Sequence, residues 1–271
     1  MKYSVSEKVV VITGSSMGIG KSLANLLGRS KAKLVINGRD KEKLLATEKE
    51  LKNLGYEVIH FSGDVTQEAE CKNLVAATLQ HFGRIDILIN NAGVSMRGIT
   101  EQLSPEVIST VFKVNAIAPV MLTQMVLPHI RKTKGSIVFI SSLTGFRGLP
   151  FIGVYCAAKM ALTAIAESLR IENHSSEIHI GVVHVGYTEI EQGKTAIGAD
   201  GKPVSLQERK GFFTATTEQV SKKIMQSILI RKKRTIIGAP GKLYYFLVRY
   251  FPGLVEWMVR SSYQKTKKFY Q

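Results

Sequence analysis

The first structural unit of the chain is Lys8-Val9-Val10-Val11-Ile12-Thr13-Gly14-Ser15-Ser16-Met17-Gly18-Ile19-Gly20, followed by a helix-forming segment at 21–27. The β-branched run before Gly14 is typical of a strand buried on both faces of a parallel sheet. A glycine-rich turn between such a strand and a helix N-terminus suits phosphate, because glycines let the backbone approach and the helix end offers free N–H groups. The spacing is G-x-x-x-G-x-G rather than G-x-G-x-x-G, and alone it indicates only a turn. Its place after the first strand favours a dinucleotide-binding turn at 14–20.

Strands and helices alternate along the rest of the chain. The sequence predicts strands at 8–13, 32–39, 57–61, 85–90, 135–140 and 235–238, and helices at 41–54, 67–82, 104–130, 157–171 and 217–230. This alternation predicts right-handed βαβ units, and therefore a single-domain α/β fold with a Rossmann-like, doubly wound parallel sheet over residues 1–238. Ligands of such folds bind at the carboxyl ends of the strands. Asp64, Asn91 and Ser142 all lie at such ends.

The end of the second strand bears on the choice of cofactor. An acidic residue there binds the adenosine ribose hydroxyl of NAD, whereas an arginine accommodates the 2′-phosphate of NADP. Gly38 and Arg39 occupy this position, which favours NADP. Asp40 follows, but it better fits the N-cap of the helix at 41–54. The alternative is that Arg39 is only a solvated turn residue.

The segment Ser141–Lys159 carries the residues that we expect to perform chemistry. Tyr155 and Lys159 are four apart on a predicted helix, so they share one face. An ammonium beside a phenol favours the phenolate and lowers the pKa of the tyrosine from its usual ~10, which suits proton exchange with a ketone or an alcohol. Ser142, just before the helix, has a hydroxyl that can hold the substrate oxygen. Taken alone, a Tyr-x-x-x-Lys pair is more often ordinary helix surface.

Several motifs in register resemble the short-chain dehydrogenase/reductase family from the first strand to about residue 190. They are Thr13-Gly14-x3-Gly18-Ile19-Gly20, Asn91-Ala92-Gly93, Asn115, Ser142 and Tyr155-x3-Lys159. The resemblance implies that Tyr155 is the acid/base, that Lys159 lowers its pKa and binds the nicotinamide ribose, and that Ser142 orients the carbonyl. Asn115 would support a water-linked proton relay. No metal site is expected.

The same resemblance implies a set of cofactor contacts. They are Gly14, Ser15, Ser16, Met17, Gly18, Ile19, Gly20, Arg39, Asp64, Val65, Asn91, Ala92, Gly93, Tyr155, Lys159, Gly186 and Thr188. The chain departs from the family pattern twice. The usual Pro-Gly after the sixth strand is replaced by Val185-Gly186, and Ile190 stands at the usual threonine position, so Thr188 is the substitute. Met17 stands where many NADP-preferring members carry a basic residue, so Arg39 would hold the 2′-phosphate largely alone.

Composition separates the catalytic part from the C-terminal tail. The 271 residues carry a net charge of +16, and the last 51 hold twelve Lys or Arg against one acid, Glu256, which is +11 of the total. Cys71 and Cys156 lie far apart in predicted helices, which favours reduced thiols and a cytoplasmic location. The first eight residues show no apolar signal segment.

Two segments near the C-terminus fall outside the alternating pattern. Residues 187–213 contain scattered Gly, Pro and polar residues without periodicity, and we expect a mobile lid over the substrate. Residues 239–271 form an extension with two short aromatic helices, at 242–251 and 254–260, too interrupted to span a bilayer. The extension resembles the tails of membrane-associated hydroxysteroid dehydrogenases and suits peripheral contact with an anionic membrane. Packing on its own domain or on a dimer partner is an equal alternative.

These observations predict an NADP(H)-dependent oxidoreductase that interconverts a ketone or aldehyde and an alcohol, on an apolar or lipid-like substrate. A homodimer or homotetramer is expected. The alternatives are a 3-oxoacyl-carrier-protein reductase and, in another class, a non-catalytic NADP-binding sensor or scaffold. Nothing in the chain resembles a base-reading module, so nucleic acid is not an expected partner.

Overall fold

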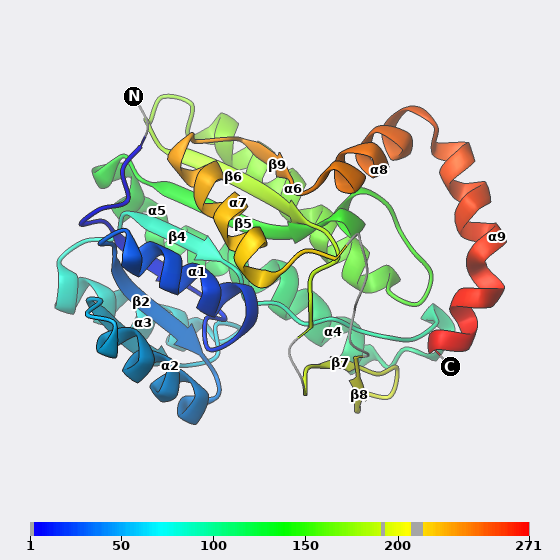
Figure 1. The fold of residues 1–271 in the computed structure, drawn as a ribbon, viewed down its shortest axis with the longest axis horizontal. Helices are drawn as coiled ribbons and strands as arrows, with labels where there is room; N and C mark the ends of the chain where they lie inside the picture. The colour runs from blue at the N-terminus through cyan, green and yellow to red at the C-terminus, as the bar shows by residue number, and fades with distance from the viewer. Residues whose placement is uncertain (1–2, 191–192, 207–213, 271) are drawn as a thin grey trace.

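A seven-stranded parallel sheet forms the centre of the protein, with the strand order β3-β2-β1-β4-β5-β6-β9 (Figure 1). This computed structural model describes residues 3–190, 193–206 and 214–270. The strands are β1 (Val9–Ile12), β2 (Lys33–Gly38), β3 (Val58–Ser62), β4 (Ile87–Asn90), β5 (Ser136–Ser142), β6 (His179–Val185) and β9 (Arg234–Ile236). The direction in which successive strands are added to the sheet reverses between β1 and β4, as in a doubly wound Rossmann-like sheet. The predicted fold class is confirmed.

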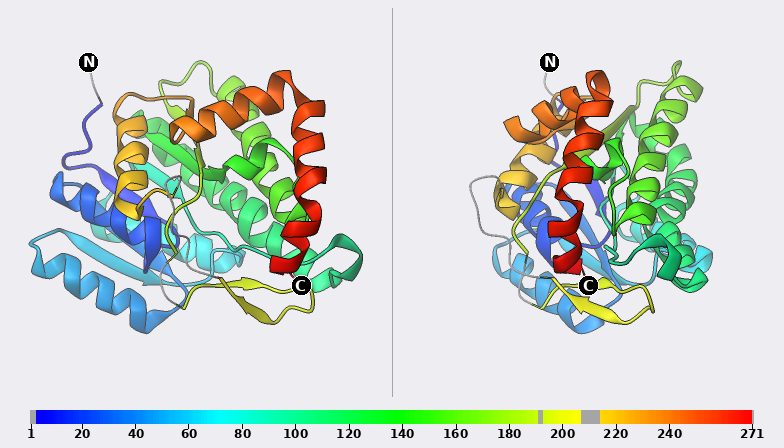
Figure 2. Two further views of the ribbon diagram at one scale, coloured as in Figure 1. Left: turned by 45° about the vertical axis from the view of Figure 1, so that its right-hand side comes forward. Right: turned by 90° about the vertical axis from the view of Figure 1, so that its right-hand side faces the viewer.

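Helices cover both faces of this sheet, as Figures 1 and 2 show. They are α1 (Gly18–Arg29), α2 (Lys41–Asn53), α3 (Glu68–Phe82), α4 (Pro105–Phe112), α5 (Ala118–Thr133), α6 (Gly153–Glu172) and α7 (Thr217–Leu229). In β1, Val10 and Ile12 pack with the apolar residues of α1, α2 and α7, whereas Val9 and Val11 pack with those of α3, α5 and α6. Both faces of the strand are buried, which is why it is uniformly apolar.

The predicted helical region at 104–130 is a single helical run with an irregular centre. Helices α4 and α5 join through a π-helical segment, Lys113–Ile117, which holds Asn115. Segments of this kind often mark functional positions. Among the described residues, 105–133 is the one helical run long and apolar enough to cross a membrane, but half of its apolar window is buried inside the protein. Because it packs in the domain core, we read it as a core helix.

The segment expected to be a lid contains regular structure. Strands β7 (Thr195–Ile197) and β8 (Pro203–Ser205) form an antiparallel hairpin. The hairpin is held to the loop after β4, where Arg97 N donates to Ile197 O and Ile197 N donates to Ser95 O. The sequence analysis did not predict this hairpin, because strands of three residues are too short to show a period; the proposed lid role of the segment stays a prediction. Residues 191–192 and 207–213 of the predicted lid lie outside the described residues.

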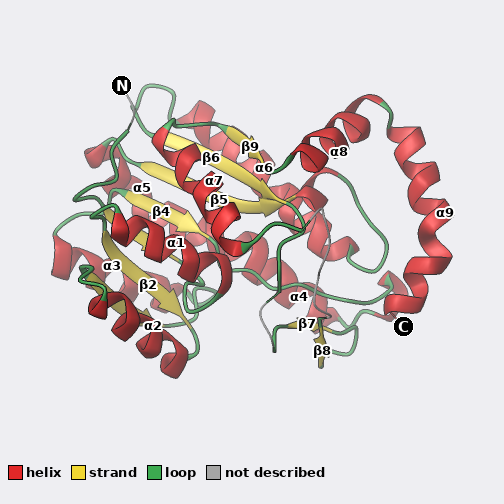
Figure 3. Cartoon of the chain, viewed as in Figure 1, coloured by secondary structure: helices red, strands yellow, loops and turns green. Residues whose placement is uncertain are grey.

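The tail forms the two predicted helices, α8 (Ala239–Tyr250) and α9 (Pro252–Tyr270). Figure 3 shows them as an arm beyond the edge of the sheet to which the arrows of β5 and β6 point. The arm is attached to the loop between β5 and α6, where Arg147 donates to Pro252 O at 3.0 Å and to the Glu256 carboxylate at 2.8 Å. The ring of Tyr263 stacks on that of Phe151. Helix α9 continues ten residues past its predicted end at 260. The sequence did not predict this continuation, because the residues after 260 are mainly polar and show no apolar period.

Candidate active site

The glycine turn after β1 is closely packed against the chain that follows β4. Gly14 has a φ of +63°, and a Cβ there would lie 2.8 Å from Ala92 Cα. A Cβ on Gly20 would lie only 2.2 Å from Gly14 O. Both positions require glycine, which leaves bare backbone at the N-terminus of α1. Gly18, the first residue of α1, has a φ of +57° and open space where its Cβ would lie, so a pyrophosphate could approach the backbone N–H groups and the positive end of the helix dipole there.

Asn91 holds this turn in place from the end of β4. Its side-chain amide donates to Thr13 O at 2.9 Å and to Gly14 O at 2.8 Å. In return, the Thr13 hydroxyl accepts from the backbone N–H groups of Asn91 and Ala92, each at 3.0 Å. Both donors of the Asn91 amide are thus bonded to the glycine turn, so the residue fixes the cradle.

The end of β2 lies against the other side of the turn. Ser15 is fully buried, and its hydroxyl donates to Ile12 O at 2.8 Å, so its side chain ties the turn to the end of β1. Ser16 is half-buried, and a Cβ on Gly38 would lie 3.2 Å from its hydroxyl. Arg39 is exposed beside them, and Asp40 is the N-cap of α2, accepting from Lys43 N, as predicted. A hydroxyl and a guanidinium therefore flank this strand end.

Asn37 is a site-forming residue that the sequence reasoning missed. Its side-chain amide donates to Phe61 O and Gly63 O, both at 3.1 Å, and it is 1% exposed. A polar residue inside an otherwise apolar predicted strand was the available signal. Through these bonds β2 fixes the loop after β3, where Asp64 accepts from Thr66 N and Val65 is buried.

Tyr155 and Lys159 lie on one face of α6, at the carboxyl edge of the sheet. The Lys159 ammonium nitrogen is 5.7 Å from the centre of the Tyr155 ring, and it donates to Ile140 O at 3.0 Å. Lys159 is 5% exposed. Burial disfavours the ammonium and lowers the pKa of Lys159 to about 8.

Asn115 and Gly93 complete the surroundings of this ammonium group. The Asn115 amide donates to Val94 O and Val111 O, both at 2.9 Å, while its carbonyl oxygen accepts from Val94 N. A Cβ on Gly93 would lie 2.9 Å from that carbonyl oxygen and 3.4 Å from the Lys159 nitrogen. The structure therefore brings together four predicted residues: Gly93 from the loop after β4, Asn115 from the π-helical segment, and Tyr155 and Lys159 from α6.

The two serines at the end of β5 have different surroundings. Ser141 is buried, and its hydroxyl donates to the main-chain oxygen of Lys159 at 2.9 Å, which anchors α6 to the sheet. The hydroxyl of Ser142 accepts from Thr144 N at 3.2 Å and is half-buried. Of the two, Ser142 is therefore the one with a hydroxyl hydrogen available to a substrate oxygen.

The segment after β6, which departs from the family pattern, is held by backbone pairing. Thr188 pairs with Ala215, and its hydroxyl donates to Gly186 O at 3.3 Å. A Cβ on Gly186 would lie 3.1 Å from the side chain of Leu143. Thr188 is half-buried at the same edge as the other predicted residues, and Ile190 follows it, also half-buried.

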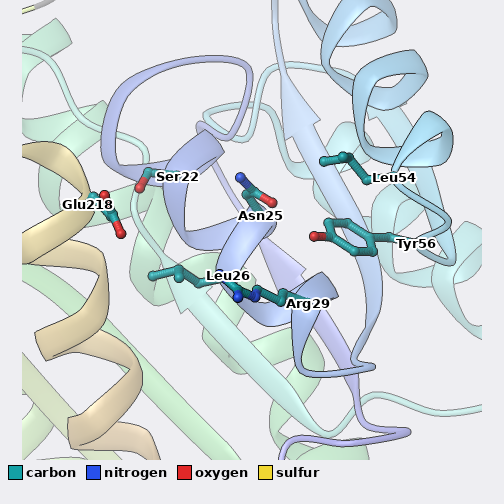
Figure 4. Close-up of a pocket in the computed structure, with 7 residues that line it drawn as sticks. All are labelled: Ser22, Asn25, Leu26, Arg29, Leu54, Tyr56 and Glu218. Atoms are coloured by element: carbon teal, nitrogen blue, oxygen red, sulfur yellow. The ribbon is translucent and has the colours of Figure 1, made fainter.

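A surface pocket on the outer face of α1 lies apart from these residues (Figure 4). It is lined by Ser22, Asn25, Leu26, Arg29, Leu54, Tyr56 and Glu218. None of the predicted catalytic or cofactor-binding residues lines it. The predicted residues at the carboxyl edge of the sheet therefore remain the candidate active site.

The parallel sheet and its glycine cradle define a dinucleotide-binding α/β oxidoreductase. Residues 8–199 match the family model described as short chain dehydrogenase, and the chain belongs to the short-chain dehydrogenase/reductase family. It is 32% identical to the dehydrogenase/reductase SDR family member 7B of Bos taurus, over 99% of this chain and 85% of the relative. It is 34% identical to the 11-beta-hydroxysteroid dehydrogenase-like 4A of Arabidopsis thaliana, over 88% and 78% of the two chains.

Solved structures share the fold. A short-chain dehydrogenase/reductase from Burkholderia phymatum in complex with NAD has a TM-score of 0.82 at 22% identity, covering 93% of this chain and 96% of that one. An alcohol dehydrogenase from Thermococcus sibiricus, complexed with 5-hydroxy-NADP, has a TM-score of 0.74 at 23% identity, covering 85% and 95%. The protein is accordingly an NAD(P)-dependent oxidoreductase that acts on CH–OH or carbonyl groups, and the predicted family and reaction class are confirmed.

Proposed function

We propose that the protein is an NADP(H)-dependent carbonyl reductase or alcohol dehydrogenase with Tyr155 as its acid/base. The observation that carries this is the meeting of Tyr155, Lys159, Asn115 and Gly93 at one point beside the glycine cradle. The nicotinamide group, when bound, supplies or accepts the hydride. The protein residues position the substrate and move the proton.

Each catalytic residue has a separate task in this proposal. The Tyr155 hydroxyl gives its proton to the carbonyl oxygen in reduction and takes it back in oxidation. The Lys159 ammonium, close to the ring, stabilises the phenolate, and burial strengthens that interaction because little water screens it. Ser142 donates to the same carbonyl oxygen. Asn115, whose side-chain amide is held by Val94 O and Val111 O, lies in the π-helical segment beside Lys159 and would support a water-linked relay there.

A ketone panel tests the proposal. Purified protein with NADPH should reduce apolar ketones, followed as loss of absorbance at 340 nm, and Tyr155→Phe should lower kcat by at least about a hundredfold, in the usual range for loss of a general acid. Ser141→Ala is the matched control, because that hydroxyl bonds only to the Lys159 main chain among the described residues. Turnover confined to 3-oxoacyl-carrier-protein would favour the acyl-carrier alternative. Tight NADPH binding without turnover of any ketone would favour a sensor or scaffold.

The preference for NADP depends on Arg39. Three observations support a preference for NADP: Arg39 is exposed, the Ser16 hydroxyl lies beside Gly38, and the neighbouring Asp40 is used as the N-cap of α2. No acidic side chain occupies the position that binds the ribose hydroxyl in NAD enzymes. Arg39→Ala should weaken NADPH binding much more than NADH binding in a fluorescence titration. An equal effect on both cofactors would refute the assignment.

The tail supports a peripheral membrane contact. One face of α8 and α9 exposes large apolar side chains at helical spacing, and we name this the outer tail face: Leu243, Phe246, Tyr250, Phe251, Leu254, Trp257 and Met258. Lys242, Arg249 and Arg260, also exposed, lie in the same helices. Aromatic side chains beside basic ones suit an anionic membrane surface. Val255, Glu256 and Tyr263 of the same tail contact the catalytic domain or are buried, so a membrane contact through the outer tail face would leave this attachment in place.

Co-sedimentation with phosphatidylcholine–phosphatidylserine vesicles tests this contact. The full-length chain should pellet with vesicles, whereas the double variant Phe246→Ser, Trp257→Ser should remain in solution. Ile171→Ser is the control, because Ile171 is more exposed than either but lies on α6. Equal pelleting of all three proteins would remove the outer tail face from this role. Light scattering on the same samples tests the proposed homodimer or homotetramer.

A further inference from the structure

His184 forms a side-chain hydrogen bond to the main chain of the predicted substrate-orienting serine. It lies in β6, where it pairs in register with Ser141 of β5, and it is fully buried. Its ring nitrogen Nδ1 lies 3.1 Å from Ser142 O. Because a carbonyl oxygen can only accept, Nδ1 carries the hydrogen and donates it. The bond therefore fixes the peptide group that follows Ser142, at the point where β5 ends.

The ring of His184 also contacts the far end of the short 3-10 turn that begins after Ser142. This turn is Leu143–Phe146, and the Phe146 ring stacks on the His184 ring with their centres 4.1 Å apart. The Phe146 ring packs in addition on that of Tyr245 from α8, with 4.6 Å between the centres. One buried side chain thus contacts both ends of the turn, and the tail helix supports the aromatic stack.

The second ring nitrogen shows that packing alone does not account for this histidine. Nε2 of His184 is buried and has no hydrogen-bond partner among the described residues. Burial lowers the pKa of His184 to about 4, so at pH 7 the ring is neutral and Nε2 is an unpaired acceptor. An apolar ring would avoid the cost of burying that nitrogen. The bond from Nδ1 to Ser142 O is the contact that an apolar ring could not make.

The Ser142 hydroxyl depends on the geometry of the same turn. It accepts from Thr144 N at 3.2 Å, so an N–H group of the turn occupies one of its lone pairs and its hydrogen remains for a substrate oxygen. A rotation of the peptide group after Ser142 would move Thr144 N relative to that hydroxyl. The bond from His184 opposes this rotation.

We propose that His184 is a positioning residue for the reaction: by fixing the peptide group after Ser142, it orients the Ser142 hydroxyl toward the substrate oxygen. This inference rests on the proposed function, in which Ser142 donates to the reacting carbonyl. It adds to the site a residue of β6 that acts through Ser142 rather than on the substrate.

Two substitutions separate the hydrogen bond from the ring contact. His184→Asn keeps an N–H group near the position of Nδ1 but loses the stacked ring, whereas His184→Phe keeps an aromatic ring but loses the donor. His184→Phe should lower kcat for ketone reduction about tenfold or more, with little change in KM for NADPH, because a displacement of ~1 Å can cost about a hundredfold in rate. His184→Asn should recover most of this loss. Equal losses in the two variants would overturn the inference.

His179→Phe is the matched control at the other end of the same strand. His179 is buried beside Ser136, its Nε2 donates to Lys232 O at 3.0 Å, and burial lowers its pKa to about 4 as well. Both phenylalanine variants should therefore lose a similar free energy of unfolding in urea, whereas only His184→Phe should lose kcat. Equal losses of kcat would leave His184 with a structural role and overturn the inference.

A double-mutant cycle shows whether His184 acts through the serine. In the Ser142→Ala background, His184→Phe should cause little further loss of kcat, because the hydroxyl that His184 orients is gone; additive losses would overturn the inference. If the wild type reduces no ketone, the proposed function fails, and hydrogen exchange of the Thr144 amide in the full-length protein tests the inference instead. Faster exchange in His184→Phe than in His179→Phe would support it, and equal rates would overturn it.

Discussion

The burial of Lys159 predicts that the native protein becomes more stable when this lysine is removed. Its pKa is about 8 in the folded protein and 10.5 in the reference state, a difference of 2.5 units. At about 1.4 kcal/mol per unit, the buried ammonium destabilises the fold by about 3 kcal/mol at pH 7. Loss of the bond to Ile140 O offsets about 1 kcal/mol of this. Lys159→Met should therefore raise the free energy of unfolding by about 2 kcal/mol at pH 7, while abolishing activity.

The pH dependence identifies the cause. Because the folded pKa lies below the unfolded one, the unfolded chain binds more protons between pH 8 and 10.5, so wild-type stability gains from Lys159 as pH rises through this window. Below pH 8 the destabilisation is fully present. The advantage of Lys159→Met should therefore be constant up to pH 8, vanish at pH ~9.5 and become a deficit of about 1 kcal/mol by about pH 10.5, because the uncharged amine can still donate to Ile140 O.

Urea unfolding of the cofactor-free protein at pH 7, 8.5 and 10 measures this difference. Lys49→Met, which removes an exposed lysine from α2, is the control and should show no such pH dependence. A Lys159→Met protein that is less stable than the wild type at pH 7, or a difference that does not change with pH, would refute the reasoning.

Three further predictions concern the cradle and the tail. Gly20→Ala should lower NADPH affinity by at least about tenfold in a fluorescence titration, because its Cβ would displace Gly14 O, 2.2 Å away; unchanged affinity would contradict the cradle. Asn91→Ala removes two bonds to the glycine turn and should reduce the free energy of unfolding by about 1–3 kcal/mol, measured in urea. Val255 is 4% exposed, so Val255→Ala should loosen the packing of α9 and speed its proteolysis. Glu256 forms an exposed ion pair with Arg147, so Glu256→Gln should change the free energy of unfolding by less than about 1 kcal/mol. A larger effect of Glu256→Gln than of Val255→Ala would show that the ion pair, rather than Val255, holds α9 to the protein.

Six of the seven strands of the sheet were predictable because each carries a strong local signal, whereas β6 entered only through the resemblance to the family. A parallel strand such as β1 is buried on both faces and reads as a continuous apolar run, and the glycines at 14–20 mark the turn that follows it. The candidate catalytic residues were predictable for a related reason. Tyr155 and Lys159 lie one helical turn apart, so their proximity follows from spacing alone.

The remaining contacts depend on residues that are far apart in sequence. Arg147 meets Glu256 across more than a hundred residues, and nothing local to either shows that the tail returns to the loop after β5. The support of the glycine turn by Asn91 is likewise visible only in space. The hairpin β7–β8 was missed because its strands are shorter than any detectable period.

The buried charged side chains differ in whether an opposite charge lies beside them. Asp86 is fully buried, but Arg84 and Lys8 pair with it, and Glu48 is paired with Lys52 and His60. Such pairs compensate the loss of hydration and need no role in a reaction. Lys159, equally buried, has no acidic partner among the described residues and bonds only to a neutral carbonyl. Folding alone favours an apolar side chain there. On the function proposed above, the ammonium serves a negative charge that appears during the reaction, and a phenolate at Tyr155, whose ring centre lies 5.7 Å from the Lys159 nitrogen, would supply that charge.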